Sequence, residues 1–341
     1  MHRTLAVLTV GLILATQLSA QDKAAIAVNV DNFCRAESDT YFARFVKEGG
    51  LGKFHHDREL ASIENQTVIR LNRDTLYSFA VVDLDASPAT VKLPKAEGRF
   101  MSLMLVNQDH YVPQVVYEPG VHRITRERIG TRYACLGVRI FVNPGSPDDI
   151  KAVHSLQDAI EIEQKAIGKF EIPAWDEPTQ KRIRDALLNL TEANGGLDSS
   201  RMFGTKDQVD PVQHLLGTAA GWGGNPRNDA YYAGAVPSKN DGKTAYQLTL
   251  KEVPVDGFWS VSVYNKDGYF TRNALNAYTL NNVTAKPNAD GSVTVRFGGD
   301  EKAENYLPIT PGWNYLLRFY RPRTAILDGT WKVPEAVLAD N

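Results

Sequence analysis

Polar residues gather at the ends of predicted strands in the first half of the chain. Two short segments, NRDTLY at 72–77 and NQDHY at 107–111, together hold two carboxylates, an arginine and a histidine. A histidine titrates near neutral pH, a carboxylate can orient it, and an arginine can hold an anionic substrate group. If the fold brings both segments to one cleft, they could perform general acid–base catalysis. The predicted catalytic residues are His110, Asp109, Asp74 and Arg73.

Each of these residues also has a structural interpretation. The side chains of an Asn-x-Asp sequence can close turns on their own backbone. Arg73 and Asp74 can form a buried ion pair that ties a strand to a loop, and His110 can be a satisfied turn residue. A glycosidase-like carboxylate pair would further require a set separation of its two carboxyl groups.

Other polar and aromatic residues could contact a ligand. Some lie around the two segments above, and others lie in the irregular stretch WGGNPRNDAYY at 222–232, where rigid aromatic rings could stack on sugars. Docking of these aromatics on the protein core is the competing interpretation. The predicted ligand-binding residues are Asn72, Tyr77, Asn107, Tyr111, His56, Arg58, Trp222 and Arg227.

The sequence predicts no metal site and no cofactor. His55 and His56 are adjacent, and on an extended segment they point to opposite sides, so a shared metal would need carboxylates from elsewhere. Cys34 and Cys135 form no Cys-x-x-Cys pair. They could form one disulfide in an oxidising compartment, but two buried thiols are the favoured interpretation, because Cys34 continues an apolar stripe along a predicted helix.

Composition and missing motifs argue against several classes of function. The 341 residues carry 38 basic and 40 acidic side chains, a formal net charge of −2, so no overall field favours nucleic acid or an anionic membrane. The sequence lacks a Gly-x-Ser-x-Gly elbow, a His-Glu-x-x-His pair, a Gly-x-Gly-x-x-Gly turn and a Gly-Lys-Ser phosphate loop. The hydrolase, metalloprotease, dehydrogenase and kinase mechanisms that use these motifs are therefore disfavoured.

The N-terminus has the three parts of a secretory signal. His2 and Arg3 precede an apolar run at 5–14, and a short segment then leads to Ala20 before a polar stretch. The run is too short to span a bilayer comfortably. We therefore expect cleavage after Ala20 and an exported protein, periplasmic or secreted, without a stable membrane span. An uncleaved anchor is the alternative.

The elements that position these residues follow from the periodicity of the sequence. Asp31 can cap a helix over 32–47 that ends at a Gly-Gly pair. From 66 to 142, short β-branched and aromatic runs alternate with turn residues, a pattern typical of an antiparallel sandwich. The predicted strands cover 67–71, 76–84, 90–93, 100–106, 112–117 and 134–142.

A helical block separates this region from a second β region. Pro147-Asp148-Asp149 and an apolar stripe predict a helix over 147–169, and a second helix over 177–193 is expected to stop at Gly195-Gly196. Asp210-Pro211 starts a third helix that ends near 223–224. The chain is therefore expected to be mainly β with a helical segment in its middle. Predicted strands of the second β region cover 247–250, 258–264, 292–297 and 315–320.

The two β regions share one similar stretch. FMSLMLVNQDHYV at 100–112 aligns with FWSVSVYNKDGYF at 258–270, with identical Phe, Ser, Asn, Asp and Tyr. In the second copy Gly268 takes the positive φ that the turn requires. In the first copy His110 stands in the glycine's place, so its side chain is expected to offset the strain.

Several longer motifs resemble a bacterial family that combines two domains of unknown function. The resemblance to DUF1254 lies in GGLGKFHHDREL, NRDTLYSFAVVDLD, MLVNQDHYVP, GTRYACLGVRIFV and LQDAIEI. The resemblance to its usual companion, DUF1214, lies in GTAAGWGGNPRNDAYYAG, DGFWSVSVYNKDGYF, NADGSVTVRFGG, NYLPITPGWNYLLRFYRP and LDGTWKVP. It implies an N-terminal immunoglobulin-like β-sandwich, a helical insert and a C-terminal jelly-roll-like β-sandwich, and it implies no activity.

The expected organisation combines these observations. It comprises a signal peptide at 1–20, an N-terminal helix and connector at 21–60, a DUF1254-like sandwich at 61–145, a helical segment at 146–225 and a DUF1214-like sandwich at 226–341.

The leading functional hypothesis is an exported acid–base enzyme of hydrolase or lyase type. Its polar small-molecule or glycan-like substrate would bind in a cleft between the N-terminal sandwich and the helical segment. The alternative is a non-catalytic ligand-binding or assembly protein of the cell envelope, because sandwich folds serve both purposes. A structural homo-oligomer without a ligand is the third hypothesis.

Overall fold

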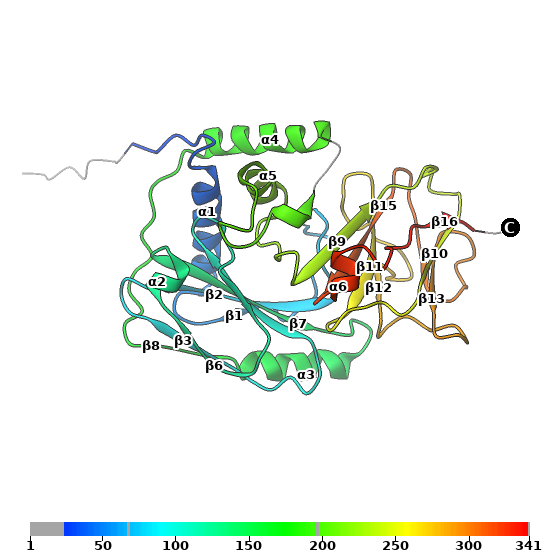
Figure 1. Cartoon of the computed structure of the whole chain (residues 1–341), viewed down its shortest axis with the longest axis horizontal. Helices are drawn as coiled ribbons and strands as arrows, with labels where there is room; N and C mark the ends of the chain where they lie inside the picture. The colour runs from blue at the N-terminus through cyan, green and yellow to red at the C-terminus, as the bar shows by residue number, and fades with distance from the viewer. Residues whose placement is uncertain (1–23, 67–68, 195–197, 340–341) are drawn as a thin grey trace, which may run out of the picture.

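The computed structural model describes residues 24–66, 69–194 and 198–339. These residues form four β-sheets in two sandwiches, with helices packed between and around them (Figure 1). The predicted fold class, mainly β with a helical segment, is confirmed. The predicted signal peptide at 1–20 lies outside the described residues.

The first sandwich contains two antiparallel sheets. Its strands are β1 (His55–His56), β2 (Thr75–Asp83), β3 (Ala89–Leu93), β4 (Met101–Asn107), β5 (Gln114–Val116), β6 (Gly120–Ile124), β7 (Tyr133–Phe141) and β8 (Glu161–Gln164). The larger sheet has the order β1-β2-β7-β4-β5, and the smaller has the order β6-β3-β8. Every second residue of a strand faces the same side, so Ala80, Leu136 and Val91 meet in one core between the sheets.

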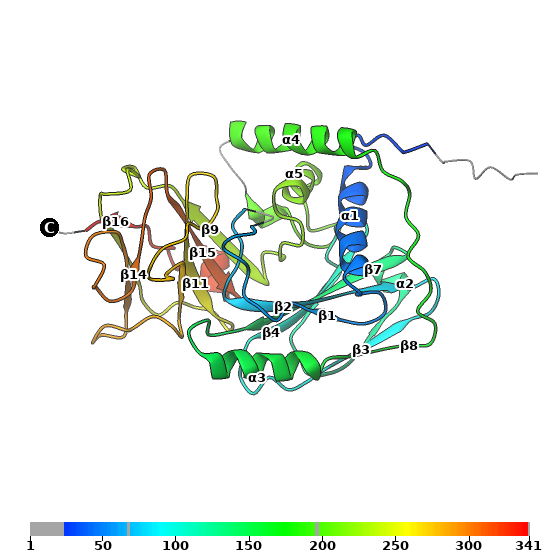
Figure 2. The same cartoon turned by 180° about the vertical axis from the view of Figure 1, so that it is seen from behind.

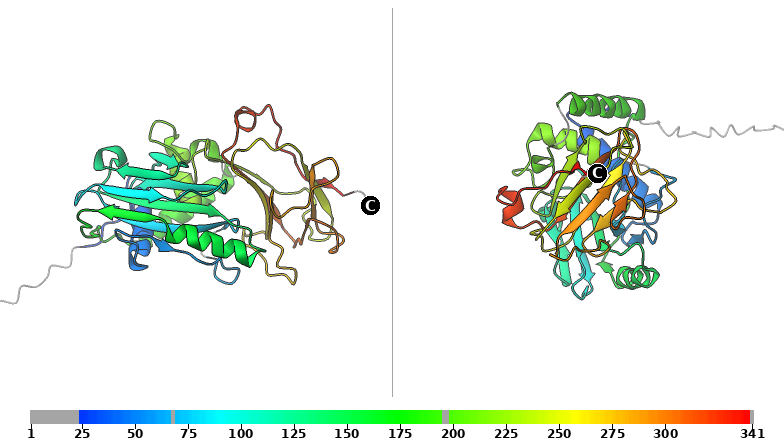
Figure 3. Two further views of the ribbon diagram at one scale, coloured as in Figure 1. Left: turned by 90° about the horizontal axis from the view of Figure 1, so that it is seen from below. Right: turned by 90° about the vertical axis from the view of Figure 1, so that its right-hand side faces the viewer.

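Helices lie around both sides of this sandwich. They are α1 (Phe33–Lys47), α2 (Arg126–Ile129), α3 (Pro147–Asp158), α4 (Glu177–Ala193), η1 (Ser199–Arg201) and α5 (Pro211–Gly221). One more helix, α6 (Thr324–Leu327), adds Ile326 to the core of the second sandwich. Helix α3 adds Val153 to the sandwich core and runs beside it (Figure 3). Helices α1, α4 and α5 stand on the opposite face of the larger sheet (Figure 2), where Phe42 and Phe45 of α1 pack against Val81 and Met104.

The second sandwich contains two four-stranded sheets. Its strands are β9 (Ala230–Ala235), β10 (Tyr246–Leu250), β11 (Trp259–Tyr264), β12 (Thr279–Asn281), β13 (Val293–Phe297), β14 (Tyr306–Leu307), β15 (Asn314–Tyr320) and β16 (Val337–Leu338). The sheets have the orders β14-β13-β10-β16 and β12-β11-β15-β9. Leu248 and Phe297 of one sheet pack against Leu317 of the other.

Three predictions about individual elements were wrong. No strand forms at 69–71, the described part of the predicted strand 67–71. The helix predicted over 147–169 ends at Asp158, because 161–164 pairs with β3 as strand β8. Asp31 does not cap α1; Asn32 occupies the N-cap position without a side-chain bond to the helix. Helix α3 ends early because the residues after it pair with a distant strand, and helical periodicity alone cannot reveal such pairing.

The aligned stretches form two turns with the same hydrogen bonds. His110 N–H donates to Asn107 O at 3.0 Å, and Gly268 N–H donates to Asn265 O at 3.0 Å. Each asparagine Oδ1 also accepts from the backbone two and four residues on, at 2.9–3.0 Å. His110 has φ 65° and Gly268 has φ 85°. The structural interpretation of these Asn-x-Asp sequences as turns is confirmed.

None of the helices in the described part of the chain is long and apolar enough to cross a membrane. Cys34 and Cys135 are free thiols in the structure.

Candidate functional site

The two segments that hold the predicted catalytic residues lie at opposite ends of the larger sheet. Thr75 at the start of β2 pairs with Phe141 of β7, whereas Asn107 at the end of β4 pairs with Ala134 of β7. A strand rises about 3.3 Å per residue, so the stretch of β7 from 134 to 141 separates the segments by about 23 Å. The cleft that would have combined Asp74 with His110 is therefore not formed.

His110 links its turn to the helical segment. Its ring is fully buried, and its Nε2 accepts a hydrogen bond from Gly223 N–H at 2.8 Å. Its Nδ1 lies 2.7 Å from Thr218 Oγ1, which itself donates to His214 O. This arrangement fits a neutral ring that is protonated at Nδ1. Burial, assisted by nearby His214, lowers the pKa of His110 well below its usual value. Both ring nitrogens are used in hydrogen bonds within the protein, and neither faces solvent.

The other predicted catalytic residues have separate partners. Asp109 forms an ion pair with Arg35 of α1 at 2.6 Å, and both side chains are about two-fifths exposed. Arg73 donates to Ala61 O and lies over the Tyr278 ring. The prediction of an Arg73–Asp74 ion pair is not confirmed, because within the described residues Arg73 and Asp74 bond to other groups.

Asp74 is buried where the two sandwiches meet. Its carboxylate accepts hydrogen bonds from Asn281 Nδ2 at 2.9 Å and from Thr279 Oγ1 at 3.2 Å, both of β12. Burial raises the pKa of this carboxyl group, and the hydrogen bond from Asn281 and the charge of nearby Arg318 partly oppose that rise. Asp74 therefore joins the two β regions and is closed to solvent.

Two predicted ligand-binding residues, Asn72 and Tyr77, meet at the same junction. Asn72 Nδ2 lies 3.3 Å from Tyr77 Oη and 2.9 Å from Tyr320 Oη of β15. Tyr77 and Arg139 are register partners on β2 and β7, and the Arg139 guanidinium lies 5.5 Å from the Tyr77 ring centre. This group of polar side chains is partly buried between the sandwiches.

The predicted residues near the other end of the sheet have structural partners. Asn107 closes its turn and donates to Ile129 O at 3.1 Å. Tyr111 stacks on His214 with ring centres 4.6 Å apart. Trp222 stacks on Tyr41 at 4.3 Å and donates to Ser38 Oγ at 3.1 Å. These contacts fit the competing interpretation, in which Trp222 packs on the protein core.

His56 and Arg58 contact β2 and α3. His56 Nδ1 lies 2.8 Å from Ser78 Oγ, and Arg58 donates to His154 O and pairs with Asp158. Burial lowers the pKa of His56. Within the described residues, no group of three or more His, Cys, Asp or Glu side chains is placed to hold a metal ion.

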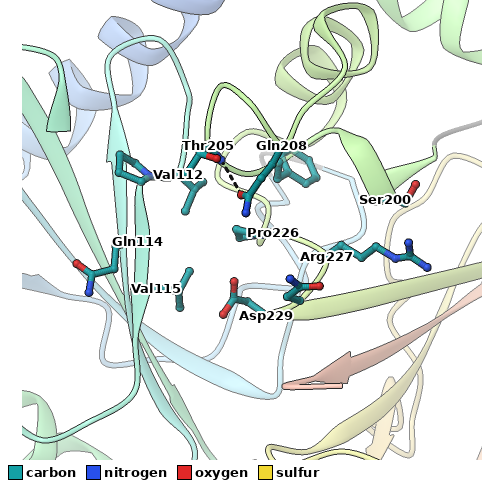
Figure 4. Close-up of a pocket in the computed structure, with 12 residues that line it drawn as sticks. Val112, Gln114, Val115, Ser200, Thr205, Gln208, Pro226, Arg227 and Asp229 are labelled. Carbon is teal, nitrogen blue, oxygen red and sulfur yellow. Dashed lines mark hydrogen bonds between the residues drawn. The ribbon is translucent and has the colours of Figure 1, made fainter. Parts of the chain in front are cut away.

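A cleft opens between the first sandwich and the helical segment (Figure 4). Its volume is about 290 Å³. One side is the edge of the larger sheet at 112–115, another is the loop at 200–208, and the floor is the turn at 226–229. A bond of 2.8 Å from Val112 N–H to Gly204 O holds the first two walls together. The lining residues are Val112, Pro113, Gln114, Val115, Ser200, Phe203, Thr205, Gln208, Pro226, Arg227, Asn228 and Asp229.

Arg227 is the predicted ligand-binding residue that lines this cleft. Its guanidinium donates to Leu327 O and lies 5.8 Å from the Tyr231 ring centre. Its Nε is buried and has no hydrogen-bond partner among the described residues. The remaining charged side chain of the lining is the carboxylate of Asp229.

Asp229 carries the acid–base potential of the cleft. It accepts a hydrogen bond from Tyr117 Oη at 2.8 Å, and burial raises the pKa of its carboxyl group. Arg321 lies over the Tyr117 ring at 4.7 Å and opposes this rise. Burial, followed by the charge of Asp229, raises the pKa of Tyr117 too, so the phenol keeps its proton.

Sequence reasoning missed Asp229, Tyr117 and Arg139. Asp229 lies with Arg227 inside the irregular stretch at 222–232, but only Trp222 and Arg227 of that stretch were predicted to bind a ligand. Arg139 interrupts the otherwise apolar strand ACLGVRIFV, and a charged residue in a strand buried on both faces is a usable signal. Nothing local marks Tyr117, since its partner lies 112 residues away.

The chain matches two family models, each described as a protein of unknown function. DUF1254 matches residues 51–164 and DUF1214 matches residues 230–324. The chain belongs to the two-domain DUF1254–DUF1214 family. The cleft combines residues 112–115 of the DUF1254 region with residues 200–229 of the segment between the two family regions.

Two solved bacterial structures are similar in fold to this DUF1254–DUF1214 protein. The VPA0106 protein from Vibrio parahaemolyticus is 20% identical with a TM-score of 0.68, and the match covers 91% of this chain and 98% of that one. A putative uncharacterized protein from Burkholderia cenocepacia is 16% identical with a TM-score of 0.51, and the match covers 91% and 87%. A comparison with curated proteins gives no match. These likenesses support the fold and carry no activity.

Proposed function

We propose that this DUF1254–DUF1214 protein is an exported binding protein for a small, uncharged, hydroxylated molecule of glycan-like character, held in the cleft of Figure 4. The observation that supports the proposal is the polar lining of the cleft. Side-chain amides and hydroxyls outnumber charges there, and the two charges, of Arg227 and Asp229, cancel.

The chemistry of the lining matches hydroxyl groups. Gln208 and Asn228 offer side-chain amides that can donate to and accept from sugar hydroxyls, and Gln208 Oε1 is held by a hydrogen bond of 3.0 Å from Thr205 N–H. Gln208 and Asp229 face the space between β5 and the floor of the cleft (Figure 4). Val112 and Val115 supply apolar contact for the carbon face of a ring. A volume of 290 Å³ suits a single small ring rather than a long chain.

Binding is better supported than hydrolysis. Glycoside hydrolysis needs two carboxyl groups across the scissile bond. The described lining contains one, Asp229, so the pair is incomplete. The raised pKa of Asp229 supports a second candidate, a single-residue proton transfer on the bound molecule. That candidate keeps the acid–base hypothesis but moves it from His110 to Asp229.

The test is a thermal-shift and calorimetric titration of the mature chain with monosaccharides, their acidic derivatives and polyols. A ligand at 100 times its Kd stabilises the fold by about 2.7 kcal/mol, which raises the Tm by several degrees. We expect a saturable shift with a neutral sugar and at least about tenfold weaker binding in Gln208→Ala. Asp267→Asn, an exposed acid in the twin turn, should bind like the wild type. Equal binding by Gln208→Ala, or no shift with any neutral sugar, would refute the proposal.

Catalysis is distinguished by the fate of the ligand. If a bound sugar is recovered unchanged after prolonged incubation, the protein is a binding protein. If a product forms, Asp229→Asn should abolish its formation while Gln208→Ala mainly raises KM, because only Asp229 can exchange a proton.

A further inference from the structure

A second polar site lies between the sandwiches, separate from the cleft. We define the Arg139 cluster as the side chains that surround the end of β7 where β9 and β15 approach it (Figure 1). Its members are Arg139, Tyr77, Tyr232, Tyr320, Asn72 and Asn225.

The guanidinium of Arg139 is buried and has only neutral partners in the described chain. The residue is 8% exposed. It donates to Gly223 O at 2.7 Å, to Asn225 Oδ1 at 3.4 Å and towards Met104 Sδ at 3.6 Å. The first of these bonds is short, whereas the amide bond is long and a thioether is a weak acceptor. A buried charge held so weakly is costly unless an anion joins it.

Three partly buried arginines of the chain pair with carboxylates. Arg99 pairs with Asp149 at 2.5 Å, Arg132 with Asp83 at 2.9 Å, and Arg184 with Glu37 at 2.5 Å. Arg139 is more deeply buried than any of these three and forms no ion pair with a described carboxylate. Arg318, which is 3% exposed, has no such pair among the described residues, but it donates to four oxygen atoms at 2.7–3.3 Å, more than Arg139 does. The contrast points to an anion supplied from outside the chain.

The tyrosine hydroxyls around Arg139 have protons to donate. Tyr77 and Tyr320 oxygens accept from Asn72 Nδ2, and the Tyr232 oxygen accepts from Asn225 Nδ2 at 2.9 Å. Among the described residues, none of these three hydroxyls donates to an acceptor. Burial raises the pKa of Tyr320 well above its usual range, so its hydroxyl keeps its proton.

The two asparagines bring these groups to one place. Asn225 contacts both Arg139 and Tyr232, and Asn72 contacts both Tyr77 and Tyr320. Ser102 lies next to Arg139 on the adjacent strand β4, and its hydroxyl is buried without a hydrogen bond to a described residue. Donors therefore converge where an acceptor is lacking, which is the pattern of an anion site.

We propose that the Arg139 cluster binds the carboxylate group of a small organic acid, with the guanidinium as its counter-charge and the tyrosine hydroxyls as additional donors. One unbalanced positive charge matches one carboxylate, whereas a phosphate dianion would leave a buried negative charge. A planar carboxylate also accepts two parallel hydrogen bonds from a guanidinium. Tyr77 and Tyr232 are only partly buried, so the cluster reaches the surface.

The aromatic surroundings favour an acid with an apolar body. Phe258 stacks on Tyr320 with ring centres 4.3 Å apart, and Phe100 lies 5.2 Å from both rings. Phe79 stacks on Tyr77 at 5.7 Å. These rings largely cover one another, so a benzoate-like ring would meet the partly exposed Tyr77 and Tyr232 while its carboxylate meets Arg139.

The test measures anion binding by the full mature chain at constant ionic strength. Acetate, benzoate and inorganic phosphate are titrated against chloride and followed by calorimetry and thermal shift. We expect saturable one-to-one binding of benzoate, weaker binding of acetate and none of phosphate. Arg139→Met should weaken benzoate binding at least about tenfold. Without ligand its Tm should equal or exceed that of the wild type, because a buried charge without a counter-ion has been removed.

Control variants keep the outcome interpretable. Tyr77→Phe removes one hydroxyl from a partly exposed ring and should weaken benzoate binding severalfold even if Arg139→Met fails to fold. Arg296→Met, on β13 of the far sheet, should bind benzoate like the wild type. Equal shifts by all three anions would overturn the proposal. Unchanged benzoate affinity in both Tyr77→Phe and Arg139→Met would also overturn it. If Arg139→Met does not fold, Arg139→Gln takes its place. Gln208→Ala should leave benzoate binding intact, so the two proposed sites can fail independently.

Discussion

Replacing His110 by glycine separates a structural role of this histidine from a chemical one. Its backbone φ of 65° suits glycine, and its twin Gly268 occupies the same turn. If His110 served only chemistry, the substitution would relieve strain and leave stability equal or higher. The contacts of the ring predict the opposite result.

The magnitude follows from those contacts. The variant leaves the buried Gly223 N–H without its acceptor, which costs about 1–3 kcal/mol. It also removes the bond to Thr218, worth about 1 kcal/mol. The ring packs 5.5 Å from Trp222 and 5.8 Å from Phe203, so its loss leaves a cavity that costs about 1–2 kcal/mol more. Relief of the positive φ returns about 1–2 kcal/mol. We expect the free energy of unfolding to fall by about 3 kcal/mol.

Urea unfolding followed by tryptophan fluorescence measures this loss, and Trp222 reports on the site directly. With an m-value of about 3 kcal/mol/M, the midpoint should move down by about 1 M. His110→Asn tolerates the same φ but makes neither ring contact, so it should also be destabilised. His122→Ala, on the edge strand β6, is the control and should change stability by less than about 0.5 kcal/mol. A His110→Gly protein as stable as the wild type would refute the reasoning.

Three further predictions follow from the charges and the N-terminus. Because burial lowers the pKa of His110 below its usual 6.5, only the unfolded chain takes up a proton there as the pH falls below 6.5, so stability should fall towards pH 5. Between pH 7 and pH 5, His110→Asn should therefore lose less free energy of unfolding than the wild type, with a difference of up to about 1.4 kcal/mol per pH unit. Urea titrations at each pH measure both proteins, and the same pH dependence in both would contradict this prediction. Asp74→Ala should lower the free energy of unfolding by about 3–5 kcal/mol, because it leaves donors of Asn281 and Thr279 unpaired. Asp74→Asn should lower it less, because it removes a buried charge. Calorimetric unfolding compares the two variants, and equal losses would argue against the role of Asp74 at the junction. Intact-mass analysis of protein made with its leader in a bacterial host should find Gln21 as the first residue in the periplasm or medium; an uncleaved chain would support the anchor instead.

Local chemistry determined much of the fold in advance. The helix predicted at about 177–193 forms as Glu177–Ala193, and the structure shows that Asp176 caps its start. The third helix begins at Asp210-Pro211, as its sequence indicates. The turns at 107–111 and 265–269 follow from asparagine side chains that bond their own backbone, which is a property of a few adjacent residues.

Long-range pairing decided the rest. Residues 161–164 continue an amphipathic pattern yet become strand β8, because β3 offers them a free edge. Residues 230–232, the end of the predicted irregular stretch at 222–232, instead begin strand β9, which pairs with β15. No local signal measures the availability of a partner strand.

Adjacent residues specify where the charges lie and how each turn closes, whereas long-range packing specifies which of these residues share a site. Strand order placed Asp74 and His110 at opposite ends of one sheet, because antiparallel pairing through β7 puts the start of β2 far from the end of β4. Packing of the second sandwich against the first brought Arg139 close to Tyr232 and Tyr320, which lie about a hundred or more residues further along the chain. Side-chain chemistry is local, but the distance between two side chains depends on the path of the whole backbone between them.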